Sequence, residues 1–118
     1  NAAVFIHSWA ATLEPKNEIA YYNLSLAFER LQSYESAINT AKRAVQLEPN
    51  NPHPLVALSL AYWQSGDRAA AQVAYRQAYN LDARYRDRAF LNHLKQAGFS
   101  SEQIEATKQI LADRLRSN

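Results

Sequence analysis

Apolar residues recur with a helical period in two neighbouring stretches of this chain. In residues 20–31 and again in residues 35–47 they fall at i, i+3, i+4 and i+7, the spacing that places apolar side chains on one face of a helix. Gln32 and Ser33 separate the two stretches. Pro49 and Pro52 follow the second stretch, where proline ends one helix and starts the next. The pattern predicts two paired amphipathic helices followed by a third.

The whole pattern repeats after 34 residues, a period typical of helical-repeat proteins. Leu24, Ser25, Leu26 and Ala27 recur as Leu58, Ser59, Leu60 and Ala61. Ala37 and Ala44 recur as Ala71 and Ala78, and these small residues allow two antiparallel helices to approach closely. The match extends back into residues 1–17 and fades beyond residue 86. We therefore expect a stack of helical hairpins.

The residues that carry this period resemble the tetratricopeptide repeat: Tyr21, Leu24, Ser25, Phe28, Ala37, Ala44 and Pro49, then Leu55, Leu58, Ser59, Tyr62, Ala71, Tyr75 and Ala78. The resemblance implies an all-α fold, a right-handed α–α superhelix built from antiparallel helix hairpins. It also implies a single domain over residues 1–118. Residues 1–17 would be the second helix of a partial repeat, 18–51 and 52–85 two full repeats, and 86–118 a degenerate C-terminal capping repeat.

The last segment has its own helix signals. A helix from about residue 86 is expected to end at Ala97 and Gly98, and Ser100 with Gln103 forms a capping box that opens a final helix to about residue 116. Polar residues such as Glu102 and Glu105 would give this cap the solvated outer face that a terminal repeat requires.

Composition excludes several classes of protein. Two glycines cannot supply the turns of an all-β fold, and the absence of cysteine excludes disulfides and thiolate metal sites. The longest apolar stretch, residues 54–63, is too short to span a bilayer, so no membrane segment is expected. Because the chain begins at Asn1 and contains no methionine, we expect a fragment with further sequence upstream. The sequence does not identify a compartment, although it favours a soluble, cytoplasmic protein.

Charge and candidate chemistry point away from catalysis. The net charge is +2, and nine of the thirteen basic residues lie in residues 60–118, too few and too poorly interleaved with aromatic residues to predict nucleic-acid binding. His7, His53 and His93 lack metal-ligand spacing, and His53 is expected to be solvated at a helix start. No phosphate loop or nucleophile motif is present. We therefore predict a protein that is not an enzyme and that needs no metal or cofactor.

The resemblance implies a concave groove lined by the first helix of each repeat. Carried onto this sequence, its groove positions include Ile19 and His53, and the predicted partner-binding residues are Tyr22, Asn23, Leu26, Arg30, Val56, Leu60, Trp63, Gln64 and Phe90. Aromatic and apolar side chains on one surface are typical of protein-binding sites. The predicted function is a non-catalytic interaction module, a scaffold or adaptor that binds a peptide or protein partner.

Some of these residues have a second interpretation. Leu26 and Leu60 could pack neighbouring helices and leave only polar and aromatic residues exposed. The chain could also be an oligomerisation or regulatory domain of a longer protein, one that includes an enzyme. Phe5, Ile6 and Trp9 make the first helix apolar nearly all round, so it either pairs with a second copy or folds back on its own core.

The resemblance also implies which partner to exclude. Chaperone-binding members grip an acidic C-terminal tail through Lys, Asn and Arg residues at fixed repeat positions. Those positions here hold Tyr22, Leu26, Ala57, Asp87 and Leu91. The carboxylate clamp is therefore absent, and an acidic chaperone tail is not the expected partner.

Overall fold

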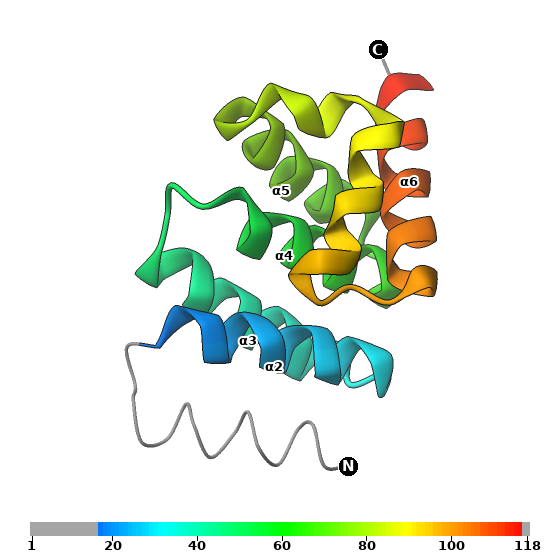
Figure 1. The fold of residues 1–118 in the computed structure, drawn as a ribbon. Helices are drawn as coiled ribbons and strands as arrows, with labels where there is room; N and C mark the ends of the chain where they lie inside the picture. Colours follow the sequence, from blue (N-terminus) through cyan, green and yellow to red (C-terminus); the bar gives the residue numbers. More distant parts are fainter. Residues whose placement is uncertain (1–16, 117–118) are drawn as a thin grey trace.

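The computed structural model describes residues 17–116, which are helical throughout, apart from short connections (Figure 1). Two α-helical hairpins come first, and a C-terminal segment of two 3₁₀ helices and one α-helix follows. In chain order the elements are α2 (Glu18–Arg30), α3 (Tyr34–Leu47), α4 (Pro52–Ser65), α5 (Arg68–Leu81), η1 (Ala83–Arg86), η2 (Arg88–Ala97) and α6 (Ser101–Arg116). No strand occurs in this range. The predicted all-α superhelical solenoid is confirmed.

Side-chain caps start most of the described helices, although α3 begins after Ser33 without one. The Asn17 side chain accepts a hydrogen bond from the Ala20 amide at 3.1 Å, and the Asp67 side chain accepts one from the Ala70 amide at 3.0 Å. These caps satisfy amides that have no partner within a helix. The α4 helix ends at Gly66 in the left-handed conformation, and Gln32 takes the same conformation between α2 and α3. Both hairpin turns thus use one backbone geometry, which glycine adopts more easily than glutamine.

One buried hydrogen bond is repeated in both hairpins. Ser25 Oγ donates to the Ala37 carbonyl at 2.7 Å, and Ser59 Oγ donates to the Ala71 carbonyl at 2.8 Å. Ala37 and Ala71 are fully buried, so the paired helices approach closely enough for this bond. The 34-residue period in the sequence therefore corresponds to a repeated tertiary contact.

Replacing either serine should destabilise the fold. Ser59→Ala removes the bond to Ala71 and should lower the free energy of unfolding by about 1 kcal/mol, and Ser25→Ala should do the same. Urea denaturation monitored by circular dichroism measures this loss. Ser65→Ala at the exposed end of α4 is the control and should change stability by less than about 0.5 kcal/mol. An equal loss in all three variants would contradict the role assigned to the repeated bond.

The segment after α5 is not the α-helix that the sequence suggested. Asp82 and Asp87 are extended, and their side chains accept hydrogen bonds from the amides two residues further on, which starts η1 and η2 as separate 3₁₀ helices. In η2, Leu91 and Leu94 are fully buried. Their three-residue spacing keeps both on one side of a 3₁₀ helix, which has three residues per turn.

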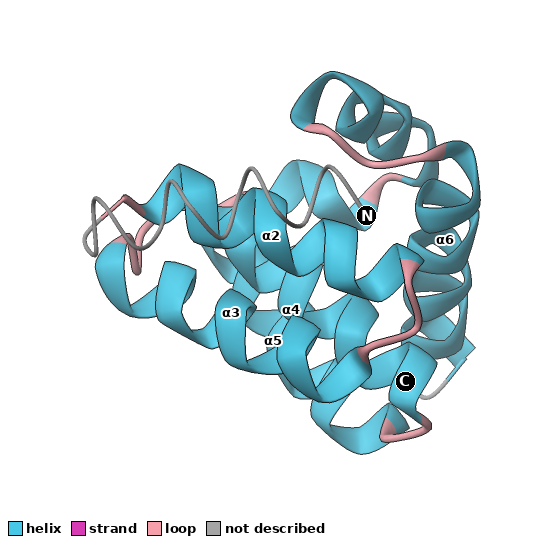
Figure 2. Ribbon diagram, turned by 90° about the horizontal axis from the view of Figure 1, so that it is seen from below, coloured by secondary structure: helices cyan, strands magenta, loops and turns pink. Residues whose placement is uncertain are grey.

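The final helix packs differently from the helices of the first two hairpins. In the step from the first hairpin to the second, α4 packs against α3 and α2. In the next step α6, rather than η2, makes the close packing against α4 and α5. Figures 1 and 2 show α6 running steeply across the direction of α2 instead of alongside it. The predicted capping box starts α6, because the Gln103 amide donates to Ser100 Oγ and the Ser100 amide donates to Gln103 Oε1.

Candidate functional site

Four of the predicted groove residues are buried by the chain itself, Tyr22 among them at 8% exposed. Leu26, Val56 and Leu60 are at most 2% exposed. They share one apolar cluster with side chains of the C-terminal segment, among them Leu94, Phe99, Ile104 and Ile110. This corrects the expectation that these three side chains are exposed on a concave surface. The C-terminal segment covers the apolar face that the first helices of the two repeats create.

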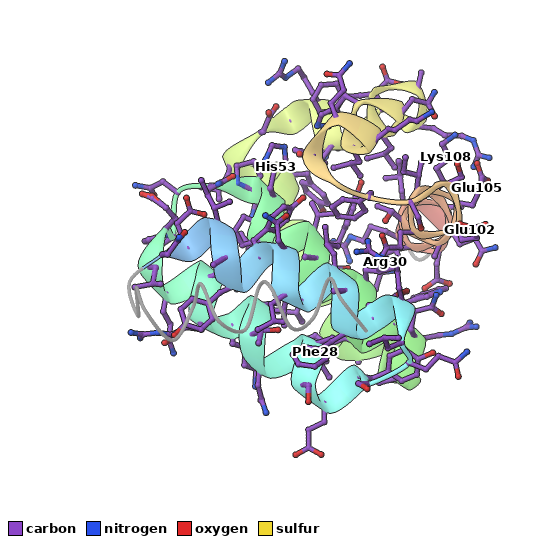
Figure 3. The ribbon with its side chains drawn as sticks, turned by 60° about the horizontal axis from the view of Figure 1, so that its bottom comes forward. Phe28, Arg30, His53, Glu102, Glu105 and Lys108 are labelled. Atoms are coloured by element: carbon purple, nitrogen blue, oxygen red, sulfur yellow. The ribbon has the colours of Figure 1, made fainter. Side chains whose placement is uncertain are left out.

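A polar seam joins the C-terminal segment to α2. The side-chain amide of Gln103 donates to the Leu26 carbonyl at 3.0 Å and to Glu29 Oε2 at 3.3 Å. Gln64 donates to Glu29 Oε1 at 3.4 Å, and Arg30 Nη1 donates to Gln103 Oε1 at 3.2 Å. Figure 3 shows Arg30 beside the start of α6, on which Glu102, Glu105 and Lys108 project outward. Arg30 and Gln64 therefore take part in contacts within the chain.

The other end of the concave face stays open and forms a pocket of about 580 Å³. In Figure 3, His53 marks this end, on the opposite side of the concave face from Arg30. The pocket lies between α2, the start of α4 and η2, and its lining residues are Glu18, Ile19, Tyr22, Asn23, Asn51, His53, His93, Gln96, Ala97 and Gly98. Tyr22 donates from its hydroxyl to the Ala97 carbonyl at 2.7 Å, which ties η2 to α2 at the base of the pocket.

Aromatic and imidazole rings form one wall of this pocket. The ring centroids of His53 and His93 are 5.7 Å apart, and His53 also packs against Tyr22 at 6.3 Å and Tyr85 at 6.4 Å. His53 is half-buried. This corrects the expectation of a solvated helix-start histidine. His53 fills the seam between α4 and η2.

Each ring nitrogen of His93 has a partner within the chain. Its Nδ1 contacts the Phe90 carbonyl, so that nitrogen carries a proton, and its Nε2 lies 3.3 Å from the Tyr85 hydroxyl. The Tyr85 hydroxyl and His93 Nε2 therefore share one hydrogen bond, so both ring nitrogens of His93 have partners within the chain. Burial raises the pKa of both Tyr22 and Tyr85, so both phenols stay protonated and available as donors.

The charge of the pocket is low and negative. Glu18 is the only carboxylate in the lining among residues 17–114, and its pKa is raised by burial and by the nearby Glu48. Within residues 17–116, no lysine or arginine lines the pocket. Amide side chains from Asn23, Asn51 and Gln96 supply donors and acceptors together, which suits hydrogen bonding to a peptide backbone.

The remaining predicted residues lie away from this pocket. Trp63 is half-buried, with the Arg68 guanidinium 4.5 Å from its ring, and Phe90 packs edge-on against Tyr85 at 5.2 Å. Of the nine predicted groove residues, the pocket brings together Tyr22 and Asn23. Phe5, Ile6 and Trp9, predicted for self-association, lie outside the described residues.

Sequence reasoning did not assign six of the lining residues to the site: Glu18, Asn51, His93, Gln96, Ala97 and Gly98. One signal for His93 was present: the 34-residue register places it where the two earlier repeats have Ser25 and Ser59. A large imidazole cannot repeat the buried serine contact, so the third hairpin had to pack differently at this position.

Neither metal binding nor membrane insertion has support in residues 17–116. No group of three or more His, Cys, Asp or Glu side chains there is arranged to hold a metal ion. No helix in this range has the length and apolarity that crossing a bilayer demands.

The geometry defines a helical-repeat protein with a small open pocket on its concave side. A family model of the tetratricopeptide repeat matches residues 19–51 and 52–85, more than half of the chain. The chain therefore belongs to the tetratricopeptide-repeat family, whose repeats generally mediate protein–protein interaction.

A curated relative shares part of this sequence. An Hsp70-Hsp90 organizing protein of Triticum aestivum is 33% identical over 73 residues, which cover 62% of this chain and 13% of the relative. The chain thus spans a small part of that protein's length.

The position of His53 predicts a pH-dependent stability. Burial and then the neighbouring His93 lower the pKa of His53 below its usual 6.5, and Asp82 opposes the shift. The folded state therefore binds the proton more weakly than the unfolded chain. This contribution to stability is complete above pH 6.5 and is lost as the pH falls from that value through the lowered folded-state pKa.

The His53→Gln variant isolates this effect, since glutamine does not titrate. Between about pH 7.5 and pH 5, the wild type should lose more stability than His53→Gln in urea denaturation. Titration of Glu18 is common to both proteins and cancels in the comparison. The same pH dependence in both proteins would show that His53 is not buried against His93 as described.

Proposed function

We propose that this chain is a non-catalytic interaction module that binds a peptide segment of a protein partner in the pocket between α2, α4 and η2. The observation that carries the proposal is the pocket itself, the part of the concave face that the C-terminal segment leaves open. Membership of a protein-binding repeat family supports it.

The rim of the pocket offers an apolar contact. Ile19 is 60% exposed although it is a large aliphatic residue, and it lines the pocket. Exposed apolar residues beside convergent polar groups are typical of binding sites. A bound peptide would place an apolar side chain against Ile19, and the amides of Asn23 and Gln96 would hydrogen-bond its backbone.

The chemistry of the pocket supports a neutral or basic peptide. Glu18 is the charged group in its described lining, and the positions where chaperone-binding relatives carry their cationic clamp hold other residues. Tyr22, Leu26, Ala57 and Leu91 at those positions are buried, and the fifth, Asp87, is acidic. An anionic tail would find no cation there. We therefore propose that the partner differs in charge from an acidic chaperone tail, despite the similarity to a chaperone organizer.

The side chains that line the pocket also support a non-catalytic role. Both ring nitrogens of His93 are engaged, one by the Phe90 carbonyl and one by the Tyr85 hydroxyl. A general base must instead present a nitrogen to a substrate proton. The polar side chains of the pocket are suited to recognition.

A matched pair of variants tests the binding site. Peptides selected from a random displayed library against the intact chain would be labelled and titrated by fluorescence anisotropy. Ile19→Lys places a cation at the pocket rim and removes the apolar contact, so it should weaken binding of the selected peptides by about tenfold or more.

Val73→Lys is the control because Val73 is 47% exposed on α5, outside the pocket, and the charge change is identical. It should leave binding unchanged. Equal loss in both variants, or selection of mainly acidic peptides, would contradict the proposed site.

A further inference from the structure

Two arginine side chains meet on one tyrosine where α5, η1 and α6 come together. The guanidinium carbon of Arg86 lies 4.5 Å from the ring centre of Tyr79, and Arg114 Nε donates to the Tyr79 hydroxyl at 3.2 Å. Tyr79 is only 6% exposed, whereas Arg86 is exposed and Arg114 half-buried. One phenol thus holds two guanidinium groups from distant parts of the sequence beside each other.

Neither guanidinium is neutralised by a carboxylate of the described residues. The ion pairs found among residues 17–114 join Arg84 to Asp82 and Lys108 to Glu105. The acidic residues nearest to these arginines in sequence have other partners. Asp82 binds Arg84 at 2.8 Å, Asp87 accepts a hydrogen bond from the Ala89 amide at 3.0 Å, and Asp113 accepts one from Gln72 at 3.0 Å. None of these carboxylates forms an ion pair with Arg86 or Arg114 among residues 17–114.

The two arginines also retain hydrogen-bond donors. A guanidinium carries five N–H groups; Arg114 directs one at the Tyr79 hydroxyl, and Arg86 lies over the Tyr79 ring. The hydrogen bond from Arg114 lowers the pKa of Tyr79. Burial opposes this shift in pKa, and the polar contact of Arg86 and the charges of both arginines add to it. The remaining donors form planar forks that match the two oxygens of a carboxylate.

We propose that Arg86 and Arg114, aligned by Tyr79, form a docking point for an acidic segment of a protein partner, which they bind through its side-chain carboxylates. Nucleic acid fits less well, because it requires a track of phosphate contacts and open aromatic faces for stacking, and Arg86 covers the Tyr79 ring. The docking point shares no residue with the pocket between α2, α4 and η2. It therefore adds a second, oppositely charged surface to the proposed function.

The probe for this surface is a fluorescein-labelled oligoglutamate peptide, titrated against the intact chain by anisotropy at low ionic strength. The double variant Arg86→Gln with Arg114→Gln should weaken its binding by about tenfold or more. Arg86→Lys with Arg114→Lys keeps the charge but loses the planar forks, and should weaken it by a smaller factor. Tyr79→Phe keeps the ring and removes the hydroxyl that orients Arg114. The affinity of this variant for oligoglutamate should therefore lie between those of the wild type and the double glutamine variant.

The matched control removes the same charge elsewhere. Lys42 and Arg43 on α3 also lie over aromatic rings, those of Tyr62 and Tyr21. Lys42→Gln with Arg43→Gln should change oligoglutamate binding less than about threefold, and so should Ile19→Lys in the pocket. Thermal unfolding of each variant checks that the fold is kept.

Three results would overturn the proposal. If Arg86→Gln with Arg114→Gln and Lys42→Gln with Arg43→Gln lost oligoglutamate affinity equally, only net charge would attract the peptide. Absence of oligoglutamate binding at low ionic strength would remove the docking point. Tighter binding of a single-stranded oligonucleotide of equal charge, with the same dependence on Arg86 and Arg114, would assign the surface to nucleic acid.

Discussion

The concave face of the two repeats is apolar and has to be removed from water. Leu26, Val56 and Leu60 form the centre of that face, and burying side chains of this size contributes roughly 1.5–3 kcal/mol each. The C-terminal segment supplies the cover through Phe99, Ile104 and Ile110. The path of α6 follows from this constraint, and it leaves the pocket between α2, α4 and η2 open.

Once α6 covers the centre of the concave face, the pocket near His53 remains for the proposed partner. The seam of Gln103, Glu29 and Arg30 fixes the covered end, and the Tyr22 bond to Ala97 fixes the border with the open end. The described lining of the open pocket holds one charged group, Glu18, while Arg86 and Arg114 meet on Tyr79 outside that lining and form no ion pair within residues 17–114. The same packing thus separates two surfaces of opposite charge.

The repeat architecture could be predicted from the sequence because its causes are local or periodic. The i, i+3, i+4 spacing, the Gly66 turn and the Ser100–Gln103 capping box each depend on residues close in sequence. The shared period of the small residues, Ser25 and Ser59 among them, predicted a close approach of the paired helices. Each of these features appears in the structure as expected.

The site could not be predicted to the same extent, because it depends on which surface covers which. Leu26 and Leu60 fit the same spacing of apolar residues whether they face a partner or the last helix of the chain itself. His53 looked like an exposed residue at a helix start, and only the path of η2 brings His93 to 5.7 Å from it. Contacts between residues so distant in sequence leave no periodic signal in a single chain.

Hydrogen exchange at α6 tests the central claim most directly. If residues 103–111 cover the concave face as an integral part of the core, their amides should exchange only through the same global unfolding that exposes residues 55–61 of α4, with equal free energies of opening. The account would be contradicted if the amides of residues 103–111 exchanged through a much easier local opening while α4 stayed protected, because the concave face would then be open in the free protein.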